Sequence, residues 1–288
     1  MAGSVVLVDK PVGPTSFDIV RIARRGLKGR VGHAGTLDPF ASGLLLILIG
    51  RATRVSNLLM GLPKEYELTV QFGAVSTTAD PTGTVASTGR RVTAAEVAAV
   101  LDRFRGRIRQ RVPLTSAVKV DGERLYKKAH RGERAEAPER EVMIYDLTMT
   151  GFDEDAQTAE VLALTGSGAY ARMLAEDLGR AVGAGGYAAA LRRTRIGGFA
   201  VEAALPPEAL SPRRYEEGGR AVFSLEAALA FLPCCELSEG DAQRAANGNE
   251  LRGVPPGRFR VYGPDGLLGV YEGRGGVARP VVVFPRTA

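Results

Sequence analysis

The longest apolar run in the chain, residues 44–49, ends at Gly50 and constrains the fold more than any other feature. A run of this length is typical of a buried strand and is far shorter than the ~20 residues that span a membrane. Further strand patterns occur at residues 4–8 and 65–72, and helical patterns lie between and after them. Strands and helices alternate without a regular βαβ period, which predicts an α+β fold rather than a doubly wound sheet.

Helix starts are indicated by capping residues. The prolines and the glycine of residues 10–14 stop the first strand, and Thr15 or Ser16 can then cap a helix that runs to about Leu27. Residues 93–96 form a capping box that opens a helix to about Phe104. The other expected elements are helices at 51–60 and 170–182, strands at 141–150 and 158–164, and a linker-like excursion at 205–219.

The last sixty or so residues have a different pattern from the rest. Two short helices are expected at residues 224–232 and 238–247, with Gly248 placed to end the second. Three short strand signals follow, near residues 258–262, 267–272 and 279–284. The sequence therefore predicts a larger domain of residues 1–222 and a small β-rich domain of residues 223–288.

The net charge of +6 favours binding to polyanions, of which nucleic acid is the commonest. Two basic clusters carry much of this charge. On an extended segment, the second would place all its guanidinium groups on one face, where they can follow a phosphate backbone. A solvated strand edge protected by charge explains that spacing equally well. The clusters are Arg21, Arg24, Arg25, Lys28 and Arg30, and Arg103, Arg105, Arg107, Arg109 and Arg111.

Several classes of site are disfavoured. Cys234 and Cys235 are adjacent, which gives no metal-ligand spacing and suits a reducing cytoplasm. His33 and His130 are the only histidines, so neither a His-based metal site nor a Ser-His-Asp triad has a supporting motif. Walker, G-x-S-x-G and H-E-x-x-H motifs are absent, and nothing at the N-terminus resembles a signal peptide. We therefore expect a cytoplasmic protein with no metal, no cofactor and no membrane segment.

Residues 32–40 combine two glycines and a proline with His33, Thr36 and Asp38, directly before the buried strand. An Asp that precedes Pro does not fit well in a helix. The carboxylate is therefore expected on an irregular loop braced by the core, where catalytic groups tend to lie. For an isolated Asp-Pro pair, stabilisation of a turn is the commoner role.

The run Gly32-His33-Ala34-Gly35-Thr36-Leu37-Asp38-Pro39-Phe40-Ala41-Ser42-Gly43-Leu44-Leu45 resembles the catalytic motif of the TruB family of tRNA pseudouridine synthases. Other segments resemble further family motifs in the family's order. Ala169 and Ala171 replace the Thr and Ile of the family's Gly-Thr-Tyr-Ile-Arg motif, so packing near Tyr170 is expected to be looser. The segments are residues 10–16, 64–66, 110–113, 116–119, 122–126, 168–179 and 191–194.

The resemblance implies that Asp38 is the catalytic residue, which attacks C1′ or C6 of the nucleotide or acts as a base at C2′. It also implies that Arg172 pairs with Asp38, lowers its pKa and keeps it ionised. Tyr170 would contact the base edge or act in a late proton transfer at C5. Without the motif, a surface position on an amphipathic helix is the favoured interpretation of Arg172.

Four more residues are implied to bind the substrate. Tyr66 would stack on the flipped uracil, Leu191 would close an apolar wall, and His33 would contact the RNA. Asp80 matches a substrate-contact segment less closely. Core packing for Tyr66 and Leu191, a structural role for His33 and a turn-forming role for Asp80 are the competing explanations.

The resemblance implies isomerisation of a uridine in the T-loop of tRNA, at position 55, on a nucleotide flipped out of its stack. It also implies a mixed, largely antiparallel sheet with a C-terminal PUA-like β-barrel. We expect a monomer with tRNA as partner and no obligate protein partner. The alternatives are a tRNA-binding folding helper, and a guide-RNA-dependent relative that acts on ribosomal RNA. The long segment 89–138 favours the stand-alone enzyme over the second alternative.

Overall fold

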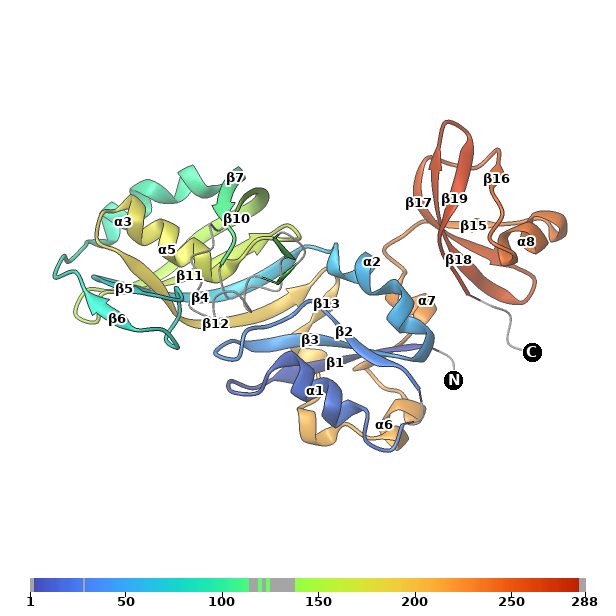
Figure 1. The fold of residues 1–288 in the computed structure, drawn as a ribbon, viewed down its shortest axis with the longest axis horizontal. Helices are drawn as coiled ribbons and strands as arrows, with labels where there is room; N and C mark the ends of the chain where they lie inside the picture. Colours follow the sequence, from blue (N-terminus) through green and yellow to red (C-terminus); the bar gives the residue numbers. More distant parts are fainter. Residues whose placement is uncertain (1–2, 28, 114–118, 121–122, 125–137, 285–288) are drawn as a thin grey trace.

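The computed structural model describes residues 3–27, 29–113, 119–120, 123–124 and 138–284. Within these residues, a ten-stranded sheet has the order β14-β1-β3-β12-β4-β11-β10-β7, with β2 paired to β3 and β13 to β12. The pairing of β12 with β3 is parallel and the other pairings described for this sheet are antiparallel. The expected α+β fold with a mixed, largely antiparallel sheet is therefore confirmed (Figure 1). The strands are β1 Ser4–Lys10, β2 Val31–Ala34, β3 Ser42–Ile49, β4 Lys64–Phe72, β7 Gly106–Arg111, β10 Glu139–Asp153, β11 Thr158–Thr165, β12 Gly186–Ile196, β13 Phe199–Ala200 and β14 Val222–Ser224.

The apolar run of residues 44–49 forms most of β3, and both of its faces are buried. Leu44, Leu46 and Leu48 pack in one core cluster, whereas Leu45 and Ile47 pack in another on the opposite face. Alternate residues of a strand point to opposite faces. The unbroken run is thus explained by two cores, one on each side of β3.

The helices begin where their caps predict. Thr15 caps α1 (Ser16–Ala23) through a capping box with Asp18, and Thr93 does the same for α3 (Ala94–Leu101). Helix α1 ends before the expected Leu27, because the chain turns away and Gly26 adopts a positive φ. The expected helix at 51–60 divides into a 3-10 helix, η1 (Gly50–Val55), and α2 (Ser56–Met60). Helix α5 (Ala171–Ala181) packs against β4 and β12.

The second basic cluster is not one strand face, so that expectation is wrong. Arg103 lies in a 3-10 turn, η2 (Asp102–Phe104), and edge strand β7 begins only at Gly106, which has a positive φ. On β7, Arg107 pairs with Glu141 and Arg109 with Glu139. These ion pairs agree with the alternative of a charged, solvated strand edge. Lys28 of the first cluster, His130 and the motif residues 114–118, 121–122 and 125–126 lie outside the described residues.

Two further segments differ from expectation. Residues 205–219 are not a linker: they contain η4 (Pro207–Ala209) and α6 (Pro212–Glu217), and the Tyr215 hydroxyl donates to the Ala23 carbonyl at 3.2 Å. Strand β12 was not expected at all. Arg192, Arg193 and Arg195 interrupt its apolar pattern, although it lies at the centre of the sheet.

The C-terminal part forms a separate five-stranded sheet in the order β15-β17-β18-β19-β16. The three predicted strands are present, and α8 packs with the sheet around a core of its own. The chain leaves the large sheet after β14 and enters the small one at Cys234, and the two units share apolar contacts through Val270 and Phe284. The elements are α7 Leu225–Ala228, β15 Cys234–Glu236, α8 Glu239–Ala246, β16 Leu251–Arg252, β17 Gly257–Gly263, β18 Gly266–Arg274 and β19 Val277–Val283. In the described part of the chain, no helix is long and apolar enough to cross a membrane.

Candidate active site

A pocket of about 830 Å³ opens where the β2–β3 loop, β4, β12 and the start of α5 meet. The predicted site residues come from segments far apart in the sequence, yet all except Asp80 line this pocket. They are His33, Asp38, Tyr66, Tyr170, Arg172 and Leu191. Asp80 lies behind Arg172 and touches the pocket only through it.

Asp38 lies on an irregular loop between β2 and β3, as expected. The preceding Leu37 is buried, and its backbone N–H donates to the Ser16 hydroxyl at 2.9 Å. That hydroxyl in turn donates to the Leu37 carbonyl at 3.1 Å. The first residue of α1 therefore holds the loop, while the Asp38 side chain keeps 32% of its area exposed.

Arg172 lies between two carboxylates and is almost fully buried. Its Nε is 3.4 Å from Oδ2 of Asp38, which is the expected pair, and its Nη1 is 2.7 Å from Oδ2 of Asp80. Arg172 lowers the pKa of Asp38 as expected, but the net shift of that pKa is upward because the effect of burial is larger. Burial raises the pKa of Asp38, and the positive charge of Arg172 only partly opposes this rise.

Asp80 is held in the turn between β5 (Ala74–Ser76) and β6 (Val85–Ser87). Its Oδ1 accepts hydrogen bonds from the Thr78 hydroxyl at 2.7 Å and from the Thr82 N–H at 2.9 Å. Although burial opposes it, hydrogen bonds from Thr82, Thr78 and Arg172 lower the pKa of Asp80. Asp80 thus forms the turn and also anchors Arg172, so the two explanations for this residue are compatible.

Three buried cations that were not among the predicted site residues surround the Asp38 loop. Lys10 Nζ donates to the carbonyls of Pro11 and Pro14 at 2.8 and 2.9 Å. Arg193 donates through Nε to the Leu44 carbonyl at 2.8 Å and through Nη2 to the Gly35 carbonyl at 2.9 Å. The third is Lys64.

Lys64 Nζ donates to the carbonyls of Met60 and Leu62 at 2.8 and 2.6 Å. Burial lowers the pKa of both Lys10 and Lys64 to about 8. The signal for these cations was their position: Lys10, Lys64 and Arg193 each lie in a segment that resembles a family motif.

The apolar wall of the pocket is continuous with the main core. Tyr66 and Leu191 are each 7% exposed and belong to the same cluster as Leu37. Their strands pair so that Leu191 lies opposite Leu68 and Arg193 opposite Tyr66. Tyr66 and Leu191 therefore pack in the core and also line the pocket.

His33 and Tyr170 complete the polar rim. Burial, together with the charge of Arg193, lowers the pKa of His33, and its buried Nδ1 has no hydrogen-bond partner among the described residues. Tyr170 immediately precedes α5. Gln110 holds its backbone by two hydrogen bonds, and the Arg140 guanidinium lies 4.7 Å from its ring centroid. These contacts of Gln110 and Arg140 were not expected from the sequence.

The pocket thus offers a partly exposed carboxylate, two tyrosine rings and several cations. This combination can hold a flat, anionic substrate and place its sugar or base against the carboxylate. The described residues contain no group of three or more His, Cys, Asp or Glu side chains that could hold a metal ion.

Residues 23–171 match the family described as TruB family pseudouridylate synthase (N terminal domain). The chain is 40% identical over 299 residues to tRNA pseudouridine synthase B of Thermobifida fusca, which covers 99% of each chain. It is 37% identical to the protein of that name from Aquifex aeolicus, over 96% of this chain and 97% of the relative.

A solved structure titled "Crystal Structure of a Cbf5-Nop10-Gar1 Complex" has the same fold. It superposes with a TM-score of 0.75 at 24% identity, covering 98% of this chain and 85% of that one. Because the family match covers half of the chain and the relatives align with nearly all of it, the chain belongs to the TruB family of pseudouridylate synthases and is an RNA pseudouridine synthase.

Proposed function

We propose that this enzyme converts uridine to pseudouridine at position 55 in the T-loop of tRNA, acting on a nucleotide flipped into the Asp38 pocket. The observation that carries the proposal is the Asp38 carboxylate, 3.4 Å from Arg172, at a pocket walled by Tyr66 and Leu191. The relatives named tRNA pseudouridine synthase B support tRNA as the substrate.

The reaction breaks the N1–C1′ bond and rejoins the base to C1′ through C5. The C5 proton is lost and N1 gains one, so substrate and product have the same atoms and no oxidant or reductant is needed. Attack of Asp38 on C1′, attack on C6 and deprotonation at C2′ all use an ionised carboxylate. Arg172 favours that form and fixes its orientation, while Tyr170 lies on the rim where the base edge would be.

The pH dependence of kcat/KM should follow from the surroundings of Asp38. Because burial raises the pKa of Asp38, the acid limb of kcat/KM should have its midpoint above the value of about 3.9 for an ordinary aspartate. Arg172→Gln removes the cation that opposes this rise, so its midpoint should move to still higher pH. Single-turnover rates measured across a pH series test this. An unchanged midpoint in Arg172→Gln would contradict the role of Arg172.

Tyr66 is proposed to stack on the extruded uracil. Aromatic stacking on a base contributes about 1–3 kcal/mol, so Tyr66→Leu should lower kcat/KM by about 5- to 150-fold. Tyr66→Phe keeps the ring and should stay close to wild type. The measurement is kcat/KM with a T-arm RNA, together with thermal unfolding of both variants. An equal loss in the Phe and Leu variants would point to the hydroxyl and rule out stacking as the main effect.

We further propose a catalytic domain of residues 1–222 and a PUA-like RNA-binding domain of residues 223–288, in a cytoplasmic monomer. The separate core of the five-stranded sheet supports the second domain. The free thiols of Cys234 and Cys235 suit a reducing compartment. Mass-spectrometric mapping of pseudouridine in an unmodified tRNA transcript, incubated with the purified enzyme, tests the proposed activity directly.

A further inference from the structure

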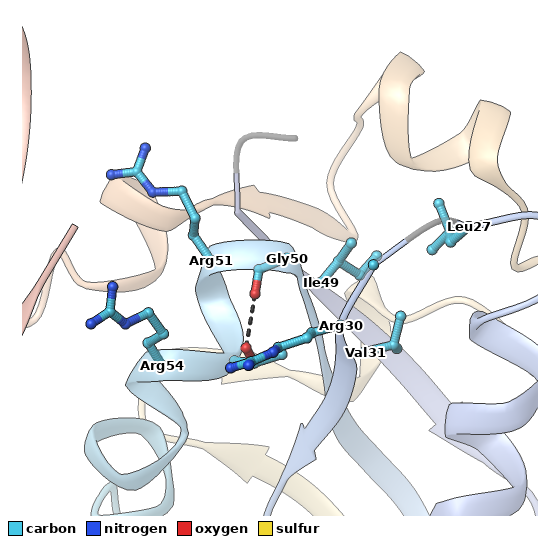
Figure 2. Close-up of a pocket in the computed structure, with 9 residues that line it drawn as sticks. Leu27, Arg30, Val31, Ile49, Gly50, Arg51 and Arg54 are labelled. Carbon is cyan, nitrogen blue, oxygen red and sulfur yellow. Dashed lines mark hydrogen bonds between the residues drawn. The ribbon is translucent and has the colours of Figure 1, made fainter. Parts of the chain in front are cut away.

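A second pocket, of about 320 Å³, lies at the other end of β2 from the Asp38 loop. Its wall is apolar on one side, where Leu27, Val31 and Ile49 lie, and carries three arginines, Arg30, Arg51 and Arg54 (Figure 2). None of its lining residues is acidic. The pocket is separate from the site described above and shares no lining residue with it.

The local backbone brings the three arginines together. Arg51 and Arg54 are three residues apart on the 3-10 helix η1, in which residues i and i+3 lie on the same face. Figure 2 shows both side chains extending from η1 in the same direction. Arg30 joins them because Val31 pairs with Ile49 and the Gly50 N–H donates to the Arg30 carbonyl at 2.8 Å.

In the part of the chain that the structure describes, no acidic side chain neutralises the charge of these arginines. Among the described residues, no carboxylate forms an ion pair with Arg30, Arg51 or Arg54, whereas Arg107 and Arg109 on β7 are both paired. The Arg51 guanidinium lies 5.2 Å from the ring centroid of Phe284, and its buried Nε has no hydrogen-bond partner within the described ranges. Buried donors are normally satisfied, and three neighbouring guanidinium groups repel one another unless an anion lies between them.

Strand β2 connects this pocket with the active site. It starts next to Arg30, carries His33 and leads into the Asp38 loop, so the two pockets are roughly 10 Å apart along the strand. Helices α1 and α2 both contact β2 (Figure 1), and Met60 at the end of α2 lines the active-site pocket.

We propose that Arg30, Arg51 and Arg54 bind backbone phosphates of the same RNA strand that places its uridine in the Asp38 pocket. The inference rests on the proposed function, because it takes RNA as the substrate. The repeating phosphates of one strand reach both pockets. Guanidinium groups bind phosphate oxygens through paired N–H donors, and a contact of this kind positions the RNA without reading its sequence.

The test compares two triple variants that lose the same charge. The pocket variant is Arg30→Gln, Arg51→Gln and Arg54→Gln, and the control is Arg105→Gln, Arg107→Gln and Arg109→Gln, whose arginines are ion-paired in the structure. Kd for a fluorescent T-arm RNA hairpin is measured by anisotropy over a salt series. Each lost phosphate contact lowers the slope of log K against log salt by about 0.7–0.9.

The pocket variant should lose about two units of slope and bind the RNA roughly 10- to 100-fold more weakly at low salt. The control should stay within about half a unit of wild type, and both variants should keep the wild-type kcat at saturating RNA. Equal slopes in the two variants would overturn the proposal. Equal slopes together with binding of inorganic phosphate to wild type would indicate a small-anion site only. Because Kd needs no turnover, absence of pseudouridine would refute the proposed function and leave this comparison intact.

Discussion

Asp38→Asn is expected to abolish pseudouridine formation while tRNA still binds with nearly wild-type affinity. The substitution keeps the size of the side chain but removes the charge that any of the three routes requires, and removal of a catalytic carboxylate or nucleophile costs on the order of 10⁴-fold or more. The loop itself should persist, because Ser16 holds Leu37 rather than the Asp38 side chain.

The measurement is mass-spectrometric mapping of pseudouridine in tRNA treated with wild type and variant, with Kd from filter binding. A matched control is Asp155→Asn, which changes an exposed aspartate in the turn between β10 and β11 and should leave turnover unchanged. Turnover in Asp38→Asn at the wild-type rate would refute Asp38 as the catalytic residue. Loss of binding together with turnover would instead favour a structural role in RNA docking.

Asp80→Ala is expected to destabilise the fold by about 3–5 kcal/mol, because it removes one partner of a buried ion pair. Arg172 would keep the longer contact of its Nε with Asp38 and the 3.4 Å hydrogen bond from its Nη1 to the Thr78 carbonyl. The loss should appear in the free energy of unfolding from urea titration. Glu141→Ala breaks an ion pair on the exposed edge of the sheet and should cost at most about 1 kcal/mol.

The difference in stability between wild type and Asp80→Ala should depend on pH in a defined way. The folded-state pKa of Asp80 is lowered, so its contribution to stability is present above the unfolded-state pKa of about 3.9 and is lost as pH falls through the folded-state value. The stability gap between wild type and Asp80→Ala should therefore be full at pH 7 and narrow in strong acid. A gap that stays constant down to pH 2 would show that lost packing, rather than the charge, causes the effect.

Local patterns in the sequence predicted the features that depend on neighbouring residues. The apolar run of β3, the Thr15 and Thr93 caps and the loop before Asp38 each follow from a few consecutive side chains. The Arg172–Asp38 pair came from the family resemblance, since nothing local links residues that far apart.

What the sequence did not predict depends on distant partners. Polar and apolar residues do not alternate regularly along β12, because the strand contains Arg193, a charged residue that is buried. Its guanidinium is satisfied by hydrogen bonds to the carbonyls of Leu44 and Gly35. The direction of the Asp38 pKa depends on how deeply the loop is enclosed, which is a property of the assembled pocket. The partners of Arg107 and Arg109 on β10 likewise become visible only once the strands are paired.

The parallel pairing of β12 with β3 has a consequence for biosynthesis. Arg193 lies beside Gly43, where a Cβ would meet the Arg193 carbonyl oxygen at 2.3 Å, and the two strands meet although a large part of the chain separates them. Closing so long a loop is slow compared with forming a hairpin. A nascent chain on the ribosome therefore contains the Asp38 loop long before β12, which lines the pocket through Leu191 and Arg193, has been synthesised. The enzyme gains its activity late in its own synthesis.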